Sequence, residues 1–294
     1  METARGNKSM RHGCLRRVIL GAMIEFSCHT WAVSDLTLTE ALGTIARLGF
    51  RYADIGSGPN LNAPRAAADP LRAAAEIKGD LALFNLKLSD LYLLLPRISL
   101  ADDDKRQKDL DLYRALLPFA QALGTPGITL SPGLAHPAAD ADARDRTVAA
   151  LREMLRLGQD AGLRVSVEPH ADSMAQTPDD ALRLLKDVPG LALTLDWAQL
   201  VAQGAAEADI RTLLPHTRHI QIRQAAKGKP QTPFEGGRVD AARVLDALYH
   251  ADYRGVVCVE YMNAPGFAPV DALFESARMR DALRAARDAL PREG

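Results

Sequence analysis

Four oxygen-bearing side chains stand at or near the C-terminal ends of four short apolar runs in the second half of the chain. They are Glu168, Asp196, Gln221 and Glu260, with intervals of 25 to 39 residues between them. The runs are mostly rich in β-branched residues, which is typical of buried strands. Because equivalent ends of successive parallel strands converge, the four side chains should meet at one point. Three carboxylates and an amide there would require a positive charge between them, which predicts a site for a hard divalent cation.

The rest of the chain alternates strand and helix patterns in the same rhythm. The expected strands cover residues 23–28, 51–55, 81–86, 127–131, 164–168, 191–196, 219–223 and 256–260. The expected helices include 36–48, 70–78 ended by Gly79, 102–123, 145–161, one begun by 177–180, 209–214, 240–251 and 270–290. Eight strand–helix pairs without a Pro/Gly/Ser linker predict a single (β/α)8 TIM barrel over residues 23–294, after a disordered extension over 1–22. A doubly wound sheet is disfavoured because Cys28-His-Thr-Trp31, after the first strand, lacks a glycine-rich phosphate loop.

The composition limits the class of protein. The 294 residues are 47% hydrophobic and 25% charged, with a formal net charge of −1. This balance predicts a globular protein with a large core and argues against a dedicated nucleic-acid binder. The three scattered cysteines form no disulfide framework or CxxC site, which favours a reduced, cytoplasmic setting. No run approaches the roughly 20 apolar residues that span a bilayer, so no membrane partner is expected.

Strand alternation predicts which side chains face the barrel interior, since residues two apart share a face. Small or polar residues then share the inward face with the four oxygen donors: Ser166, Thr194, His219, Arg223 and Cys258. The opposite face carries Val165, Val167, Leu193, Leu195, Ile220, Ile222, Val257 and Val259, which should pack against helices. A single acidic residue at a strand end is most often a solvated loop residue, but three acidic residues and an amide on four successive strands favour a site.

Several of these segments resemble a known family. They are residues 41–50 with 52–55, Val167-Glu-Pro-His170, Leu195-Asp196 and 255–260. Over about residues 23 to 290 the chain is similar to the xylose-isomerase-like TIM barrels, the sugar phosphate isomerase/epimerase superfamily that also contains AP endonucleases. The resemblance implies a divalent metal bound by Glu168, Asp196 and Glu260, with a fourth ligand from the seventh strand.

Two positions depart from the family pattern. Where the family has His-x-His on the seventh strand, this chain has His219-Ile-Gln221, and its Asp-x-x-His after the sixth strand is Asp196-Trp-Ala-Gln199. A glutamine keeps a neutral donor but replaces imidazole nitrogen with a harder amide oxygen. With Gln221 as the fourth ligand, the site should favour Mg²⁺ or Mn²⁺ over Zn²⁺ or Co²⁺. The alternative is that metal binding is weakened or lost.

Other residues could contact a substrate or assist the reaction. His170 could act as an acid or a supporting partner, and the remaining candidates for substrate binding are His29, Trp31, Trp197, Arg223 and Lys227. The two tryptophans suit stacking on a sugar face and equally suit plain burial. The two basic side chains could hold a phosphate or carboxylate, or could form salt bridges.

These residues predict a metal-dependent isomerase or epimerase of a small carbohydrate. Glu168 and Glu260, on opposite sides of the substrate, would remove and return a proton next to a carbonyl, through an enediolate. A dehydratase of the sugar-acid or inosose type would share that intermediate. A phosphodiesterase would need more histidine ligands, and a non-catalytic barrel is the remaining alternative. In each case the chain could also assemble as a homo-oligomer.

Overall fold

Eight parallel strands form a closed barrel in which each strand pairs with the next along the chain and β8 pairs with β1. The computed structural model describes residues 24–137, 139–264 and 266–291, so the expected extension over 1–22 lies outside the described residues. The strands are β1 (Glu25–His29), β2 (Tyr52–Gly56), β3 (Lys87–Leu93), β4 (Ile128–Leu130), β5 (Val165–Val167), β6 (Ala192–Asp196), β7 (Thr217–Ile222) and β8 (Val256–Val259). The predicted single (β/α)8 barrel is therefore confirmed.

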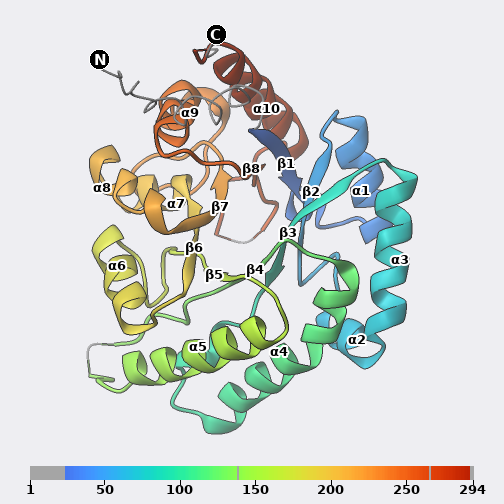
Figure 1. Cartoon of the computed structure of the whole chain (residues 1–294). Coiled ribbons are helices and arrows are strands. Elements are labelled where there is room, and N and C mark those ends of the chain that lie inside the picture. The colour runs from blue at the N-terminus through green and yellow to red at the C-terminus, as the bar shows by residue number, and fades with distance from the viewer. Residues whose placement is uncertain (1–23, 138, 265, 292–294) are drawn as a thin grey trace, which may run out of the picture.

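Helices surround the barrel and join successive strands (Figure 1). The α-helices are α1 (Leu38–Arg47), α2 (Ala63–Ala68), α3 (Pro70–Leu83), α4 (Asp103–Leu123), α5 (Ala143–Asp160), α6 (Pro178–Asp187), α7 (Trp197–Ala202), α8 (Glu207–Arg211), α9 (Ala241–His250) and α10 (Ala272–Asp288). The 3₁₀ turns are η1 (Thr30–Val33), η2 (Pro96–Ser99), η3 (Leu214–His216) and η4 (Phe234–Gly236). Among the described residues, none of the helices is long and apolar enough to cross a lipid bilayer.

The predicted third strand, residues 81–86, is wrong. Helix α3 continues through Gly79 to Leu83, and the strand begins at Lys87. A glycine inside a helix costs only about 1 kcal/mol relative to alanine, and burial of Ile77 and Leu81 on either side of Gly79 offsets this cost. The chain instead turns at Asn85, which has a left-handed φ of 53°, a conformation that asparagine tolerates better than most residues.

The two faces of the strands differ in polarity, as the alternation predicted. The outward-facing valines, leucines and isoleucines of β5 to β8 belong to the hydrophobic core between barrel and helices. Inside the barrel, the hydroxyl oxygens of Ser166 and Thr194 lie 2.8 Å apart, and Arg218 forms an ion pair of 2.8 Å with Asp90. A hydrogen-bonded polar layer therefore fills the barrel beneath its C-terminal mouth.

Candidate functional site

Three carboxylates meet at the C-terminal mouth of the barrel. Glu168 directly follows β5, Asp196 ends β6 and Glu260 directly follows β8. One oxygen of each lies within 4.8 Å of the others, and all three side chains are buried. Taken alone, this spacing could hold a metal ion. The parallel strands produce the cluster because they place their C-terminal ends on one rim.

The same cluster contains a cation that belongs to the chain. Arg223, one residue beyond β7, is fully buried, and its Nη1 lies 2.8 Å from Asp196 Oδ2 and 2.9 Å from Glu260 Oε2. Its Nε donates a hydrogen bond of 2.9 Å to the carbonyl of Pro230, and its guanidinium lies 5.2 Å over the ring of Phe267. These contacts hold the guanidinium in place between two of the three carboxylates.

Gln221, the predicted fourth metal ligand, contacts the carboxylate cluster through its amide nitrogen, which is a hydrogen-bond donor and cannot bind a metal ion. Its Nε2 donates a hydrogen bond of 2.9 Å to Glu260 Oε1, whereas its Oε1 has no hydrogen-bond partner among the described residues. An ion placed between Asp196 and Glu260 would have to share their oxygens with the Arg223 guanidinium. The residues present therefore do not fit a divalent cation at that position, although three carboxylates surround it.

Glu168 has a different environment from Glu260. The hydroxyl of Tyr92, at the end of β3, donates a hydrogen bond of 2.6 Å to Glu168 Oε2. Burial, followed by the negative charge of Asp196, raises the pKa of Glu168 to about 8. Glu168 is therefore protonated at neutral pH. The sequence-based prediction missed Tyr92 because it placed the third strand too early; Tyr92 stands at a strand end just as the four predicted residues do.

Several donors surround Glu260. Besides Arg223 and Gln221, His29 Nε2 lies 3.8 Å from Glu260 Oε1. The backbone N–H of Trp31 donates to His29 Nδ1 at 3.1 Å, which leaves the proton of the neutral imidazole on Nε2. Burial lowers the pKa of His29 to about 4, so the ring is neutral at pH 7. Burial, followed by the negative charge of Glu168, raises the pKa of Glu260 well above its ordinary value, and the Arg223 guanidinium acts in the opposite direction.

An aromatic wall stands next to the carboxylates. The ring of Trp31 lies 4.3 Å from that of His29 and 5.0 Å from that of Tyr92, measured between centroids. Gly56, at the end of β2, allows this approach, because a Cβ there would lie 2.5 Å from atoms of both His29 and Trp31. The Nε1 of Trp31 has no hydrogen-bond partner within the described part of the chain. The wall thus offers an apolar face with a free donor.

Three of the predicted residues form no side-chain hydrogen bond or ion pair with the three carboxylates among the described residues. His170 Nε2 lies 3.1 Å from Ser131 Oγ, and its Nδ1 lies 2.6 Å from the carbonyl of Ala171. Trp197 packs in the hydrophobic core with 3% of its surface exposed, in agreement with plain burial. Lys227 is exposed on a turn and its stem lies near Gly204, so the structure does not bring it to the carboxylates.

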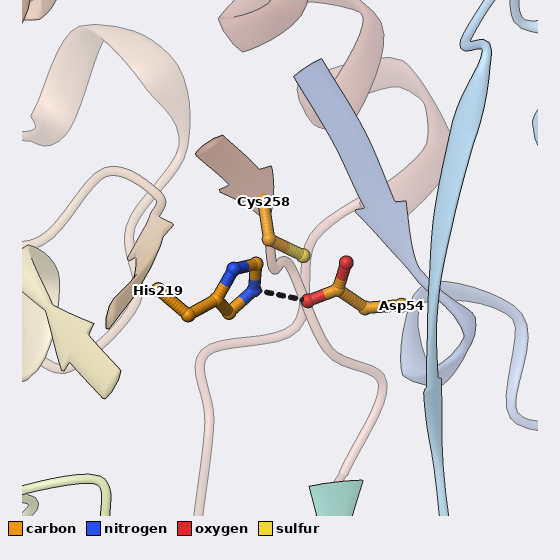
Figure 2. Close-up of side chains that lie close together, drawn as sticks. All are labelled: Asp54, His219 and Cys258. Carbon is orange, nitrogen blue, oxygen red and sulfur yellow. Dashed lines mark hydrogen bonds and ion pairs between the residues drawn. The ribbon is translucent and has the colours of Figure 1, made fainter. Parts of the chain in front are cut away.

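A second group of potential metal ligands lies inside the barrel (Figure 2). Asp54 of β2 accepts a hydrogen bond of 2.7 Å from Ser27 at one oxygen, and its other oxygen lies 2.5 Å from His219 Nε2. Burial alone would raise the pKa of Asp54, but its contact with His219 holds it below its ordinary value. Burial also raises the pKa of Cys258 well above its ordinary value, so its thiol stays protonated. A neutral thiol beside an already bonded carboxylate is a poor ligand set, and we assign this group to the polar interior of the barrel.

Comparison with known proteins agrees with the fold. A family model described as xylose isomerase-like TIM barrel matches residues 42–288, and the chain belongs to this family. No curated protein matches the sequence.

Several solved structures have the same fold at low sequence identity. A D-allulose 3-epimerase from Methylomonas sp. is 21% identical, with a TM-score of 0.68 over 91% of this chain and 98% of the other. An L-ribulose 3-epimerase is 18% identical, with a TM-score of 0.71 over 90% and 96%. A probable 3-DHS dehydratase of petrobactin synthesis from Bacillus anthracis is 17% identical, with a TM-score of 0.71 over 89% and 99%. These likenesses establish the barrel architecture.

Proposed function

We propose that this protein is an isomerase or epimerase that moves a proton at a carbon next to the carbonyl of a small carbohydrate. The observation that carries the proposal is the pair Glu168 and Glu260, two buried carboxylates that approach the mouth from β5 and β8 in unlike surroundings. Such pairs, whose environments separate an acid from a base, are typical of proton-transfer sites.

The hydrogen-bond partners assign a role to each glutamate. Glu168 accepts a hydrogen bond from Tyr92, and with a pKa raised to about 8 it holds a proton at neutral pH. Burial raises the pKa of Glu260 as well, but a protonated Glu168 removes the charge that raises it further, and the contacts from Arg223 and Gln221 at 2.9 Å each favour the ionised form of Glu260. Glu260 would remove the proton from the substrate carbon, and Glu168 would deliver one to the opposite face or the neighbouring carbon.

Unpartnered polar atoms support a polyhydroxyl substrate. Five buried polar atoms near the ends of β1, β6 and β7 have no hydrogen-bond partner among the described residues: Trp31 Nε1, His29 Nε2, Gln199 Oε1, Gln221 Oε1 and Arg223 Nη2. Leaving a buried polar group unpaired costs about 1–3 kcal/mol, so a ligand that pairs with several of them would be favoured. Sugar hydroxyls have this donor and acceptor character, and the ring of Trp31 suits the apolar face of a sugar.

The names of similar structures point to the same class of substrate. They include epimerases of D-allulose, of L-ribulose and of a 3-keto-D-glucoside, all of them keto-sugars. The 3-DHS dehydratase among them supports elimination of water as the second candidate reaction, because proton removal is common to both.

Solvent deuterium incorporation tests this proposal whichever product the reaction forms. The protein is incubated in D₂O with ketopentoses, ketohexoses, 3-keto-glycosides and their phosphates, and each sugar is examined by NMR and mass spectrometry. We expect deuterium next to the carbonyl of at least one sugar, and Glu168→Gln and Glu260→Gln should each lower its rate by roughly 10²-fold or more. Glu153→Gln, at an exposed ion pair with Arg114, is the matched control and should retain the rate.

Two results would decide against the proposal. Absence of deuterium in every sugar would refute a carbohydrate isomerase, and full exchange in both glutamate variants would refute the two-carboxylate mechanism. Loss of water from a sugar in the same spectra would identify the dehydratase instead.

A further inference from the structure

We propose that Arg223 takes the place of a catalytic metal ion, so that this barrel performs its reaction without a divalent cation. The proposal rests on the proton-transfer function above and goes beyond it by identifying the cation that stabilises the reacting oxygen. It replaces the expectation, drawn from the sequence, of Mg²⁺ or Mn²⁺ held by Glu168, Asp196, Gln221 and Glu260.

The contacts of Arg223 hold its guanidinium in one position. Nη1 binds Asp196 and Glu260 at 2.8 and 2.9 Å, and Nε binds the carbonyl of Pro230 at 2.9 Å. The ring of Phe267 lies 5.2 Å from the guanidinium, and none of the Arg223 side chain is exposed. Moving this guanidinium aside for an ion would break all of these contacts at once.

The charge of the cluster supports the same conclusion. Asp196 and Glu260 both face one guanidinium, which is always charged. A divalent ion at the same oxygens would lie beside a like charge in a buried site, where such repulsion is little screened. Gln221 adds to this because its Nε2 faces Glu260 as a hydrogen-bond donor, whereas an ion would require an acceptor.

One donor of Arg223 remains for the substrate. Nη2 is buried and has no hydrogen-bond partner in the part of the chain that the structure describes. We infer that Nη2 donates to the carbonyl oxygen of the substrate. As the C–H bond breaks, its proton passes to Glu260 and its electron pair forms the C=C bond, while the carbonyl electrons move to the oxygen held by Nη2. The reverse movement takes the proton of Glu168 onto carbon, so the step needs no oxidant, reductant or further cofactor.

Direct metal measurements test this proposal independently of the substrate. Purified protein is dialysed, analysed by mass spectrometry of metals, and titrated with Mn²⁺ while free Mn²⁺ is followed by electron paramagnetic resonance. We expect far less than one equivalent of any divalent metal and no saturable Mn²⁺ site below about 1 mM. One Mn²⁺ bound per chain at micromolar concentration, and lost in Asp196→Asn, would overturn the proposal.

A pair of substitutions should open the site to metal. Arg223→Ala removes the internal cation, and Gln221→His adds an imidazole ligand, so the double variant should bind Mn²⁺ at least tenfold more tightly than the natural protein. Arg254→Ala, which removes an exposed arginine just before β8, is the matched control and should leave Mn²⁺ binding unchanged. If the folded double variant binds no more Mn²⁺ than the control, Arg223 does not exclude the ion. If the double variant does not fold, the Mn²⁺ titration of the natural protein still decides.

Activity measurements separate this proposal from the proposed function. If a sugar exchanges deuterium, EDTA treatment and added Mg²⁺ or Mn²⁺ should change the rate by less than twofold. Arg223→Lys, which keeps the charge but lacks the second guanidinium nitrogen, should lower the rate by roughly tenfold or more. An exchange rate abolished by EDTA and restored by Mn²⁺ would overturn the role of Arg223. Absence of exchange in every sugar would refute the function alone, because the Mn²⁺ titrations still report on the cation.

Discussion

Replacing Glu168 by glutamine should make the protein more stable, and increasingly so as the pH rises. The pKa of Glu168 is raised to about 8 in the folded protein, from an ordinary value of 4.5, mainly by burial. The folded chain therefore keeps this proton between pH 4.5 and 8, whereas the unfolded chain releases it. Below pH 4.5 the Glu168 side chain therefore does not reduce the free energy of unfolding. As the pH rises towards 8, the reduction grows progressively.

The two pKa values set the size of the effect. Because each pH unit corresponds to 1.36 kcal/mol, the ionisable side chain lowers the free energy of unfolding by about 1 kcal/mol at pH 5 and about 4 kcal/mol at pH 8. The Glu168→Gln variant carries no ionisable group there, and its amide can still accept the hydrogen bond from Tyr92. Its stability gain over the natural protein should therefore grow by about 3 kcal/mol between pH 5 and pH 8.

Urea unfolding at pH 5, 6, 7 and 8, followed by circular dichroism, measures this gain. Glu76→Gln is the matched control, because Glu76 lies on α3 with 54% of its side chain exposed. Its effect should stay within about 0.5 kcal/mol at every pH. A stability difference between Glu168→Gln and the natural protein that is the same at pH 5 and pH 8 would refute the raised pKa, and with it the role of Glu168 as the acid.

Three further substitutions test the surroundings of the carboxylates. Tyr92→Phe removes a hydrogen bond that lowers the pKa of Glu168. The alkaline limb of the pH–rate profile for deuterium exchange should therefore move up by roughly one pH unit. A limb that does not move would show that this hydrogen bond does not affect the pKa of Glu168. Gly56→Ala places a Cβ 2.5 Å from atoms of His29 and Trp31. It should reduce the free energy of unfolding, measured in urea, by about 1–3 kcal/mol. An unchanged free energy of unfolding would contradict the close packing of His29 and Trp31 against Gly56. His170→Gln should change the exchange rate by less than about threefold, since both ring nitrogens have partners outside the carboxylate cluster; a loss of roughly 10²-fold would place His170 in the proton transfer.

The sequence by itself determined the barrel and the convergence of its acidic residues. Hydrophobic alternation identified the outward faces of β5 to β8, and the regular spacing of Glu168, Asp196 and Glu260 predicted that they would meet. This was possible because parallel strands in one barrel must end on one rim, whichever residues fill the loops. The pattern failed at β3, where a helix continued through Gly79 and packing overrode the local stop signal.

Only the tertiary structure decided which charges face one another at that rim. Tyr92 and Glu168 are 76 positions apart in the chain, and they meet because β3, β4 and β5 pair side by side. Arg223 is a long side chain whose many rotamers include solvent-directed ones, so its position beyond β7 does not specify where its guanidinium lies. Closure of β7 against β8 and the contact with Phe267 fix it between Asp196 and Glu260. Residue types and spacing thus predicted a positive charge among the carboxylates, and packing determined that an arginine of the chain supplies it.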